Sequence, residues 1–160
     1  MSQDTGSTQV AIITGASSGV GQASAIALAE AGWSISLFAR RTDKLQETRQ
    51  LCKDPAKVLL IDGDVSKEDD VLKLFRETID RFGTFISFKA AQLPGVRVDH
   101  SSPLGRLDVL FNNAGISSPQ VPIEEVSLEA FQSVINVNLI GTFLCTREAV
   151  KIFKAQTPQG

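Results

Sequence analysis

A glycine-rich string near the N-terminus, TGASSGVG at residues 14–21, has residue types and a spacing that can do chemistry. It follows the short apolar run at 10–13 and precedes an alanine-rich segment with helical spacing at 19–31. Glycines at a strand-to-helix turn let the backbone approach a ligand, while the free N–H groups and dipole of the helix attract a phosphate. This context predicts a phosphate-binding loop, with a glycine turn that binds nothing as the alternative.

Three further strings place polar side chains directly after predicted strands. They are FARR at 38–41, DGDVS at 62–66 and NNAG at 112–115. An arginine at a strand end can pair with a phosphate group, and Asp or Asn can bond a ligand or tie a turn together. Their chemistry therefore depends on the elements that position them.

Strands and helices alternate along most of the chain. The predicted strands are residues 10–13, 34–38, 57–61 and 106–111, and the predicted helices are 19–31, 43–52, 66–82 with Ser66 as its N-cap, and 127 to about 154. This alternation implies right-handed crossovers and a parallel sheet, which is an α/β fold. A chain of 160 residues is long enough for one domain, which we predict over 1–160.

Residues 84–105 break the alternation. The segment has no sustained hydrophobic period, and a structureless connection of this length is uncommon in a compact domain. Without it, Gly83 would lead directly into Arg106. We predict an irregular insertion at 84–105, and a retained intron is one hypothesis for its origin. His100, the only histidine of the chain, lies in it and is expected to be a solvated loop residue.

Composition and charge exclude several classes of function. The net charge of -2, with 21% charged and 42% hydrophobic residues, leaves no basic surface for nucleic acid or an anionic membrane. Cys52 and Cys145 form no CxxC motif and no Cys/His cluster, so no metal site is predicted. The polar N-terminus lacks a signal-peptide core, and no unbroken apolar run approaches the roughly 18 residues of a membrane span. The predicted location is cytoplasmic.

The glycine-rich string, the Asp-Val pair in DGDVS and the NNAG string, in this order, resemble the short-chain dehydrogenase/reductase family over residues 8–83 and 106–160. The resemblance implies an incomplete Rossmann-like doubly wound parallel sheet, with strand order 3-2-1-4 and helices on both faces. It also implies hydride transfer between a nicotinamide cofactor and an alcohol or carbonyl. The cofactor-binding residues it implies are Gly15, Ser17, Ser18, Gly19, Val20, Gly21, Asp64, Val65, Asn113, Ala114 and Gly115.

The FARR string bears on the choice between the two nicotinamide cofactors. Ala39 occupies the position where an NAD-dependent member of the family carries Asp, and Arg40 and Arg41 follow. A guanidinium pairs bidentately with the ribose 2′-phosphate of NADP. We therefore predict NADP(H), with Arg40 as its main partner. Solvated surface arginines remain an alternative here, as does a purely local turn role for Asp64.

Asn138 lies inside the predicted long helix, where asparagine has poor propensity. It matches the catalytic Asn of the family, which is thought to hold a water in a proton relay; a satisfied buried Asn is the alternative. The proton donor of the family is a Tyr in a Tyr-x-x-x-Lys segment, aided by a Ser, and this sequence contains no tyrosine. We expect a truncated form that lacks the catalytic Tyr and Lys and binds NADP(H) weakly at best.

Two alternatives to an enzyme stay open. In the first, the chain is a non-catalytic cofactor-binding or partner-binding fragment that docks onto a full-length relative. In the second, it is the product of a mis-spliced gene. Intact members of the family are expected to form homo-oligomers through the long helix. An incomplete sheet is expected to leave apolar surface on the fourth strand and on that helix.

Overall fold

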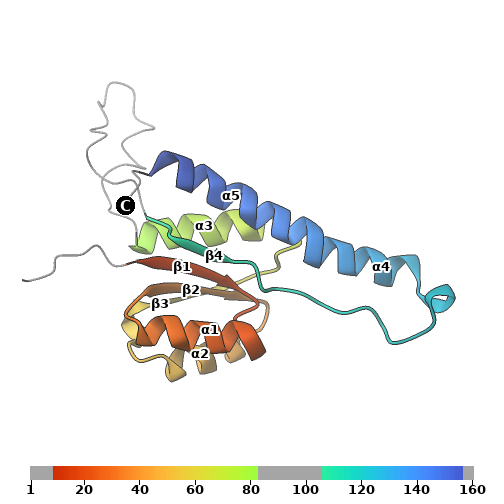
Figure 1. The fold of residues 1–160 in the computed structure, drawn as a ribbon, viewed down its shortest axis with the longest axis horizontal. Helices are drawn as coiled ribbons and strands as arrows, with labels where there is room; N and C mark the ends of the chain where they lie inside the picture. The colour runs from red at the N-terminus through yellow and green to blue at the C-terminus, as the bar shows by residue number, and fades with distance from the viewer. Residues whose placement is uncertain (1–8, 83–105, 157–160) are drawn as a thin grey trace, which may run out of the picture.

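The computed structural model describes residues 9–82 and 106–156, and the predicted insertion at 84–105 lies outside them. Its four-stranded parallel sheet has the order β3-β2-β1-β4 (Figure 1). The strands are β1 (Val10–Thr14), β2 (Ser34–Ala39), β3 (Val58–Asp62) and β4 (Val109–Phe111). The helices are α1 (Gly19–Glu30), α2 (Thr42–Leu51), α3 (Glu68–Phe82), α4 (Leu128–Ile135) and α5 (Thr142–Ala155), with short helices η1 (Pro55–Lys57), η3 (Ile123–Glu125) and η4 (Asn136–Gly141).

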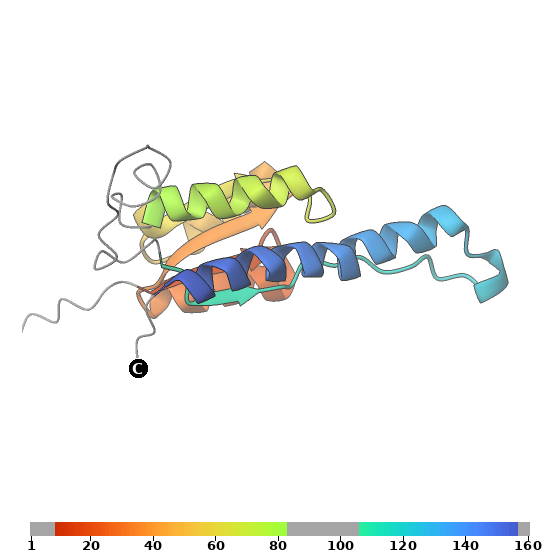
Figure 2. The ribbon, with the colours of Figure 1, turned by 90° about the horizontal axis from the view of Figure 1, so that it is seen from above.

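Helices cover both faces of the sheet, α1 and α2 on one and α3 and α5 on the other (Figures 1 and 2). All five residues of β1 are buried, as expected for a strand in a parallel sheet with two covered faces. The predicted strand order and the helices on both faces are confirmed. The two apolar layers are Val10, Ile12, Phe38, Ile61, Val65, Val71, Leu74, Phe75, Leu107, Leu144, Cys145 and Ala149 on the α3/α5 face, and Ile13, Ala16, Ala25, Ala29, Ile35, Leu37, Leu45, Cys52 and Val58 on the α1/α2 face.

The predicted long helix is continuous over α4, η4 and α5. Ser127 caps it, because its hydroxyl accepts a hydrogen bond from the N–H of Ala130 at 3.1 Å. Its middle six residues, 136–141, form a π-helix, a local widening that is frequent at functional sites. The N-terminal part runs beyond the edge of the sheet (Figure 1). Its exposed apolar residues are Leu128, Phe131, Leu139, Ile140, Phe143, Val150 and Phe153.

Among the described residues, the stretch Leu128–Ala155 is the one helix long and apolar enough to cross a membrane by length and hydropathy alone. The sequence predicts no such span, since the apolar residues are spread along the helix instead of forming one run. In α5, Leu144, Cys145 and Ala149 are buried in the apolar layer between this helix and the sheet, and Glu148 pairs with Lys151. These contacts are those of a helix that packs on a protein core.

Two predicted element starts are wrong, and side-chain hydrogen bonds explain both. The third helix begins at Glu68 because Ser66 is not its N-cap: the Ser66 hydroxyl donates to Asp64 Oδ1 at 2.8 Å. The fourth strand begins at Val109. Before it, the N–H of Val10 in β1 donates to the side-chain Oδ2 of Asp108 at 2.8 Å in place of a backbone carbonyl, which interrupts the ladder. The side chain of Gln156 accepts from the N–H of Leu107 at 3.1 Å and donates to its carbonyl at 2.9 Å.

Candidate cofactor site

The glycine-rich loop lies against the segment that follows β4. Gly15 has φ +66°, a conformation that favours glycine, and a Cβ there would lie 2.9 Å from both Ala114 Cα and Asn113 Nδ2. Gly19 has φ +57°, and a Cβ there would meet nothing within 4 Å. The loop is therefore packed closely at its beginning and open where α1 begins.

Asn113 clamps the loop to the end of β4. Its side-chain amide donates to the carbonyls of Thr14 at 3.0 Å and Gly15 at 3.2 Å. In return, the Thr14 hydroxyl accepts from the N–H groups of Asn113 at 3.1 Å and Ala114 at 3.0 Å. A Cβ at Gly21 would come 2.5 Å from Asn113 Nδ2, so glycine at this position leaves room for the clamp. Asn112 instead donates to the Thr146 hydroxyl of α5 at 3.0 Å.

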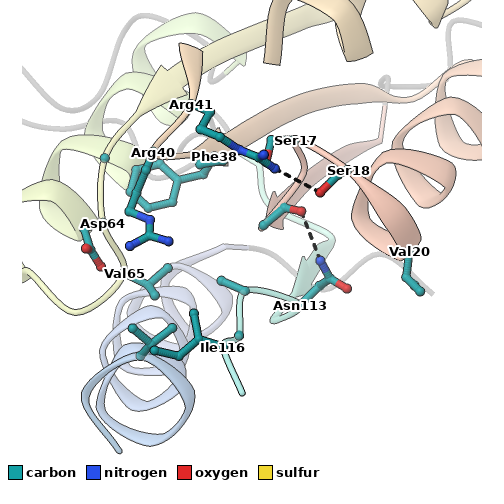
Figure 3. Close-up of a pocket in the computed structure, with 16 residues that line it drawn as sticks. Ser17, Ser18, Val20, Phe38, Arg40, Arg41, Asp64, Val65, Asn113 and Ile116 are labelled. Atoms are coloured by element: carbon teal, nitrogen blue, oxygen red, sulfur yellow. Dashed lines mark hydrogen bonds between the residues drawn. The ribbon is translucent and has the colours of Figure 1, made fainter. Parts of the chain in front are cut away.

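The ends of the four strands surround a cavity of about 330 Å³ (Figure 3). It is bordered by most of the predicted cofactor residues, which are Gly15, Ser17, Ser18, Val20, Arg40, Arg41, Asp64, Val65, Asn113, Ala114 and Gly115, and also by Phe38, Ala39, Gly63, Ile116 and Val137. Three predicted residues do not border it: Gly19, Gly21 and Asn138. A polar loop, two arginines and an apolar wall thus meet in one space, which is the composition of a nucleotide pocket.

One end of the cavity collects groups that bind phosphate. The Arg41 guanidinium donates from Nη2 to the hydroxyls of Ser17 and Ser18, each at 3.1 Å (Figure 3). The exposed Arg40 extends toward the cavity from the same strand end. The Arg41 guanidinium and the two hydroxyls match the planar, multidentate recognition of a phosphate, and the Arg40 guanidinium lies on the side of Asp64 (Figure 3).

Asp64 forms the neighbouring wall as an ionised carboxylate. Burial raises its pKa, but hydrogen bonds from the N–H and hydroxyl of Ser66 outweigh that effect, aided by the charges of Arg40 and Lys67, so that the pKa lies below its usual value. The two Ser66 bonds, at 2.9 and 2.8 Å, are both made to Oδ1. Asp64 therefore both accepts the hydrogen bonds of the turn and borders the cavity.

Two close approaches of glycine shape the apolar wall, and neither was predicted from the sequence. A Cβ at Gly63 would lie 2.7 Å from the Phe38 ring, and one at Gly141 would lie 2.7 Å from Val65 Cγ2. The first glycine lets the ring pack below the β3 end, and the second lets the long helix approach Val65. Gly141 could have indicated its close contact from the sequence alone. Glycine in a helix interior is unfavourable by about 1 kcal/mol relative to alanine, so its presence there suggests a packing reason.

Asn138 holds the chain that leaves β4. Its Oδ1 accepts from the N–H of Ile116, and its Nδ2 donates to the Ile116 carbonyl, both at 2.9 Å. Its own carbonyl accepts from the Thr142 hydroxyl at 2.8 Å, within the π-helical stretch. The side chain is thus satisfied by backbone groups, while Ile116 and Val137 beside it border the cavity.

Comparison with known proteins identifies this arrangement. The profile of the short chain dehydrogenase family matches residues 9–87 and 92–160. The chain belongs to the short-chain dehydrogenase family. The match omits only residues 88–91 between its two parts, within the predicted insertion. The resemblance seen in the three sequence strings is confirmed, and with it membership of a family of oxidoreductases.

Three relatives illustrate how this dehydrogenase chain compares with others. Glucose 1-dehydrogenase of Gluconobacter oxydans is 34% identical over 142 residues, which are 88% of this chain and 45% of that protein. A 3-ketoacyl-(acyl-carrier-protein) reductase from Brucella melitensis, solved with NADH, has a TM-score of 0.74 at 29% identity, covering 91% of this chain and 50% of that one. An alcohol dehydrogenase from Thermococcus sibiricus, solved with 5-hydroxy-NADP, has a TM-score of 0.73 at 31% identity and covers 92% of this chain and 54% of that one.

The chain therefore spans about half the length of the relatives it matches. The two solved relatives hold nicotinamide cofactors, NADH in one and 5-hydroxy-NADP in the other.

Proposed function

We propose that the chain binds NADP(H) in the cavity at the strand ends and forms the cofactor half of an oxidoreductase that acts on alcohols and carbonyls. The observation that carries this proposal is the contact of Arg41 with Ser17 and Ser18 at the rim of a glycine-rich loop. The open space at Gly19 provides the room that a pyrophosphate needs at the start of α1.

The preference for NADP(H) over NAD(H) rests on the side chains after β2. Ala39 provides no carboxylate to accept from a ribose 2′-hydroxyl, whereas Arg40 and Arg41 bring two positive charges to the border of the cavity. If NAD(H) were bound, these arginines would have no 2′-phosphate to pair with. A 2′-phosphate would bond Arg41 and the two serine hydroxyls at once.

The remaining walls suit the other parts of the cofactor. The Asp64 carboxylate and the Val65 side chain would hold the adenine, and the small residues Asn113, Ala114 and Gly115 would let a ribose lie against the backbone. A bound nicotinamide supplies the hydride acceptor or donor. In this proposal Asn138 is a positioning residue, because it holds Ile116 and so fixes the chain beside that ribose.

Hydride transfer at a carbonyl also needs a proton donor within hydrogen-bond reach. The 160-residue sequence contains no tyrosine. We propose that these residues alone bind cofactor with little or no turnover. An NADPH-oxidation assay with a panel of carbonyl compounds tests this, and robust turnover by the chain would overturn it.

We further propose a cytoplasmic protein that self-associates through the exposed apolar face of α4 and α5, which carries Phe131, Leu139 and Phe143. Light scattering coupled to gel filtration measures the oligomeric state. A monomer at tens of micromolar would contradict self-association.

The cofactor proposal is tested by titrating the chain with NADPH and NADH and following nicotinamide fluorescence. We expect Arg40→Ala and Arg41→Ala each to weaken NADPH binding by about tenfold and to change NADH binding by less than about twofold, since only NADPH carries the 2′-phosphate. Arg76→Ala is the control, because Arg76 is an exposed residue of α3 that does not border the cavity. Equal affinity of all variants for NADPH would contradict the assignment.

A further inference from the structure

A buried threonine of α2 contacts the glycine-rich loop from behind. Thr48 is fully buried, and its hydroxyl lies 3.0 Å from the carbonyl of Ala16 and 3.1 Å from that of Lys44. Gln22 of α1 donates to the same hydroxyl from Nε2 at 3.0 Å. The two carbonyls share the one hydroxyl hydrogen, and the contact with Lys44 is the usual one between a helical threonine and the carbonyl four residues before it. The contact with Ala16 joins residues 32 positions apart and connects α2 to the loop.

The contact with Ala16 fixes the direction of a peptide group. The described chain has no cis peptide bonds, so the N–H of Ser17 points opposite to the carbonyl of Ala16. Because Thr48 holds that carbonyl toward α2, the Ser17 N–H is directed away from α2. Ser17 borders the cavity, and its hydroxyl bonds Arg41, the residue that precedes α2.

Helix α2 therefore holds the loop at two points. The Arg41 side chain contacts the hydroxyls of Ser17 and Ser18 on the cavity side, and the Thr48 hydroxyl contacts Ala16 on the buried side. Arg41 and Thr48 are separated by nearly two turns of helix. A rotation of the peptide between residues 16 and 17 would have to break the contact of Thr48 with the Ala16 carbonyl. Buried carbonyls seldom go without a donor, which makes the Thr48 contact costly to lose.

We propose that Thr48 is a positioning residue for the phosphate end of the cavity. By holding the Ala16 carbonyl, it keeps the N–H and hydroxyl of Ser17 available beside the Arg41 guanidinium for the 2′-phosphate of NADP(H). This inference rests on the proposed function. It assigns part of the cofactor selectivity to a side chain that does not touch the cavity.

The test compares NADPH and NADH binding by the full chain and two variants. Thr48→Val keeps the side-chain shape and removes the hydroxyl, so NADPH affinity is expected to fall about tenfold and NADH affinity to change less than about twofold. Thr48→Ser restores the hydroxyl and is expected to bind NADPH within about threefold of wild type. A purely structural role would weaken both cofactors equally and so would not change their ratio.

Thr78→Val is the matched control. Thr78 is also fully buried, and its hydroxyl also bonds a carbonyl four residues earlier, that of Leu74 at 2.8 Å, but it lies on α3 beside Ser36 and away from the cavity. It is expected to lower thermal stability and leave the NADPH-to-NADH affinity ratio unchanged. Thr48→Ala, read by the same criteria, replaces Thr48→Val if circular dichroism shows the latter to be unfolded.

The outcomes separate the two proposals. Wild-type chain that binds NADPH, with a Thr48→Val variant whose NADPH-to-NADH ratio matches wild type, overturns the role of Thr48 alone. The same holds if Thr48→Ser behaves like Thr48→Val, or if Thr78→Val shifts the ratio equally. Wild-type chain that binds neither cofactor overturns the proposed function, and this inference with it.

Discussion

Single residues in this chain carry out positioning tasks that their types alone do not reveal. Asn113 was predicted as a cofactor contact, and its side-chain amide is occupied by two carbonyls of the glycine-rich loop. Asn138 was predicted as catalytic, and both its side-chain atoms bond the backbone of Ile116. In both cases an amide supplies a donor or acceptor that regular structure lacks at that point. Such residues shape the cavity by holding other residues in place.

The Asn113 clamp predicts a measurable stability difference between adjacent asparagines. Asn113→Ala leaves the carbonyls of Thr14 and Gly15 without their side-chain donor, and we expect the free energy of unfolding to fall by about 1–3 kcal/mol. Asn112→Ala removes one exposed bond to Thr146 and is expected to change it by less than about 0.5 kcal/mol. Urea unfolding of both variants measures the difference. Equal losses would show that the clamp adds no more to stability than the exposed bond of Asn112 to Thr146.

The two cysteines are expected to be unreactive in the folded chain. Burial raises the pKa of the Cys145 thiol to about 12 and also raises that of Cys52. Because the thiolate is the reactive form, Ellman's reagent at pH 8 should react with neither thiol within minutes in native buffer and with both at once in denaturant. Rapid reaction of one thiol in native buffer would mean that its helix opens readily.

At the scale of elements, the position of the long helix depends on Gly141. A Cβ there would lie 2.7 Å from Val65 Cγ2 and 2.9 Å from Val65 Cβ, so the helix approaches the wall of the cavity as closely as glycine allows. The π-helical turn at 136–141 ends at this contact and places Asn138 opposite Ile116. Helix geometry and cavity shape are therefore coupled at one point.

This coupling predicts that the sign of a Gly141→Ala effect depends on residue 65. Alanine adds about 1 kcal/mol of helix propensity, but overpacking typically costs about 1–3 kcal/mol, so we expect net destabilisation in the wild-type background. In a Val65→Gly background, which removes the two closest atoms and leaves the backbone carbon of residue 65 at 3.2 Å, the same change should stabilise. Urea unfolding of the four chains tests this, and an equal effect in both backgrounds would contradict it.

Most elements could be predicted from the sequence because the spacing of apolar residues within an element and the glycines at its ends are local features. The parallel order 3-2-1-4 followed from the resemblance, and the β1 strand and α1 helix followed from the residues themselves. The errors arose where side chains replace backbone partners, as Asp108 does for the N–H of Val10. The contact of Arg41 with Ser17 could not be predicted from the sequence either, because it joins two side chains that are 24 positions apart in the chain.

At the scale of the whole molecule, charged side chains connect α3 and α5, the two helices that cover one face of the sheet. Arg147 of α5 bonds Glu68 at the start of α3 and also Glu148, which Lys151 bonds from the other side at 2.8 Å. Glu148 is nearly buried, with 9% of its side chain exposed, so its charge depends on these two partners. Packing of α5 on the core therefore nearly buries a carboxylate that bonds these two cations.

The stability of the molecule is accordingly expected to fall in acid. Burial raises the pKa of Glu148, but hydrogen bonds from Lys151 and Arg147 and their charges outweigh it, so the pKa lies below the ordinary 4.5; the pKa values of Asp62 and Asp64 are also lowered, from 3.8. A carboxyl whose pKa is lower when folded binds protons more readily when unfolded. Its contribution is therefore complete above the ordinary pKa and is lost as the pH falls through the folded value.

Glu148→Gln isolates this contribution. It keeps the side-chain shape but replaces the carboxylate acceptor of two cations, and we expect a loss of about 1–3 kcal/mol at pH 7, where wild-type Glu148 is ionised. As the pH falls through the lowered pKa of folded Glu148, the wild-type side chain is protonated as well, so the two chains should converge in stability. Urea unfolding from pH 7 down to the acid end of that titration measures both curves. A difference that stays constant over this range would show that the loss comes from packing, because only a charge effect disappears when the wild-type carboxylate is protonated.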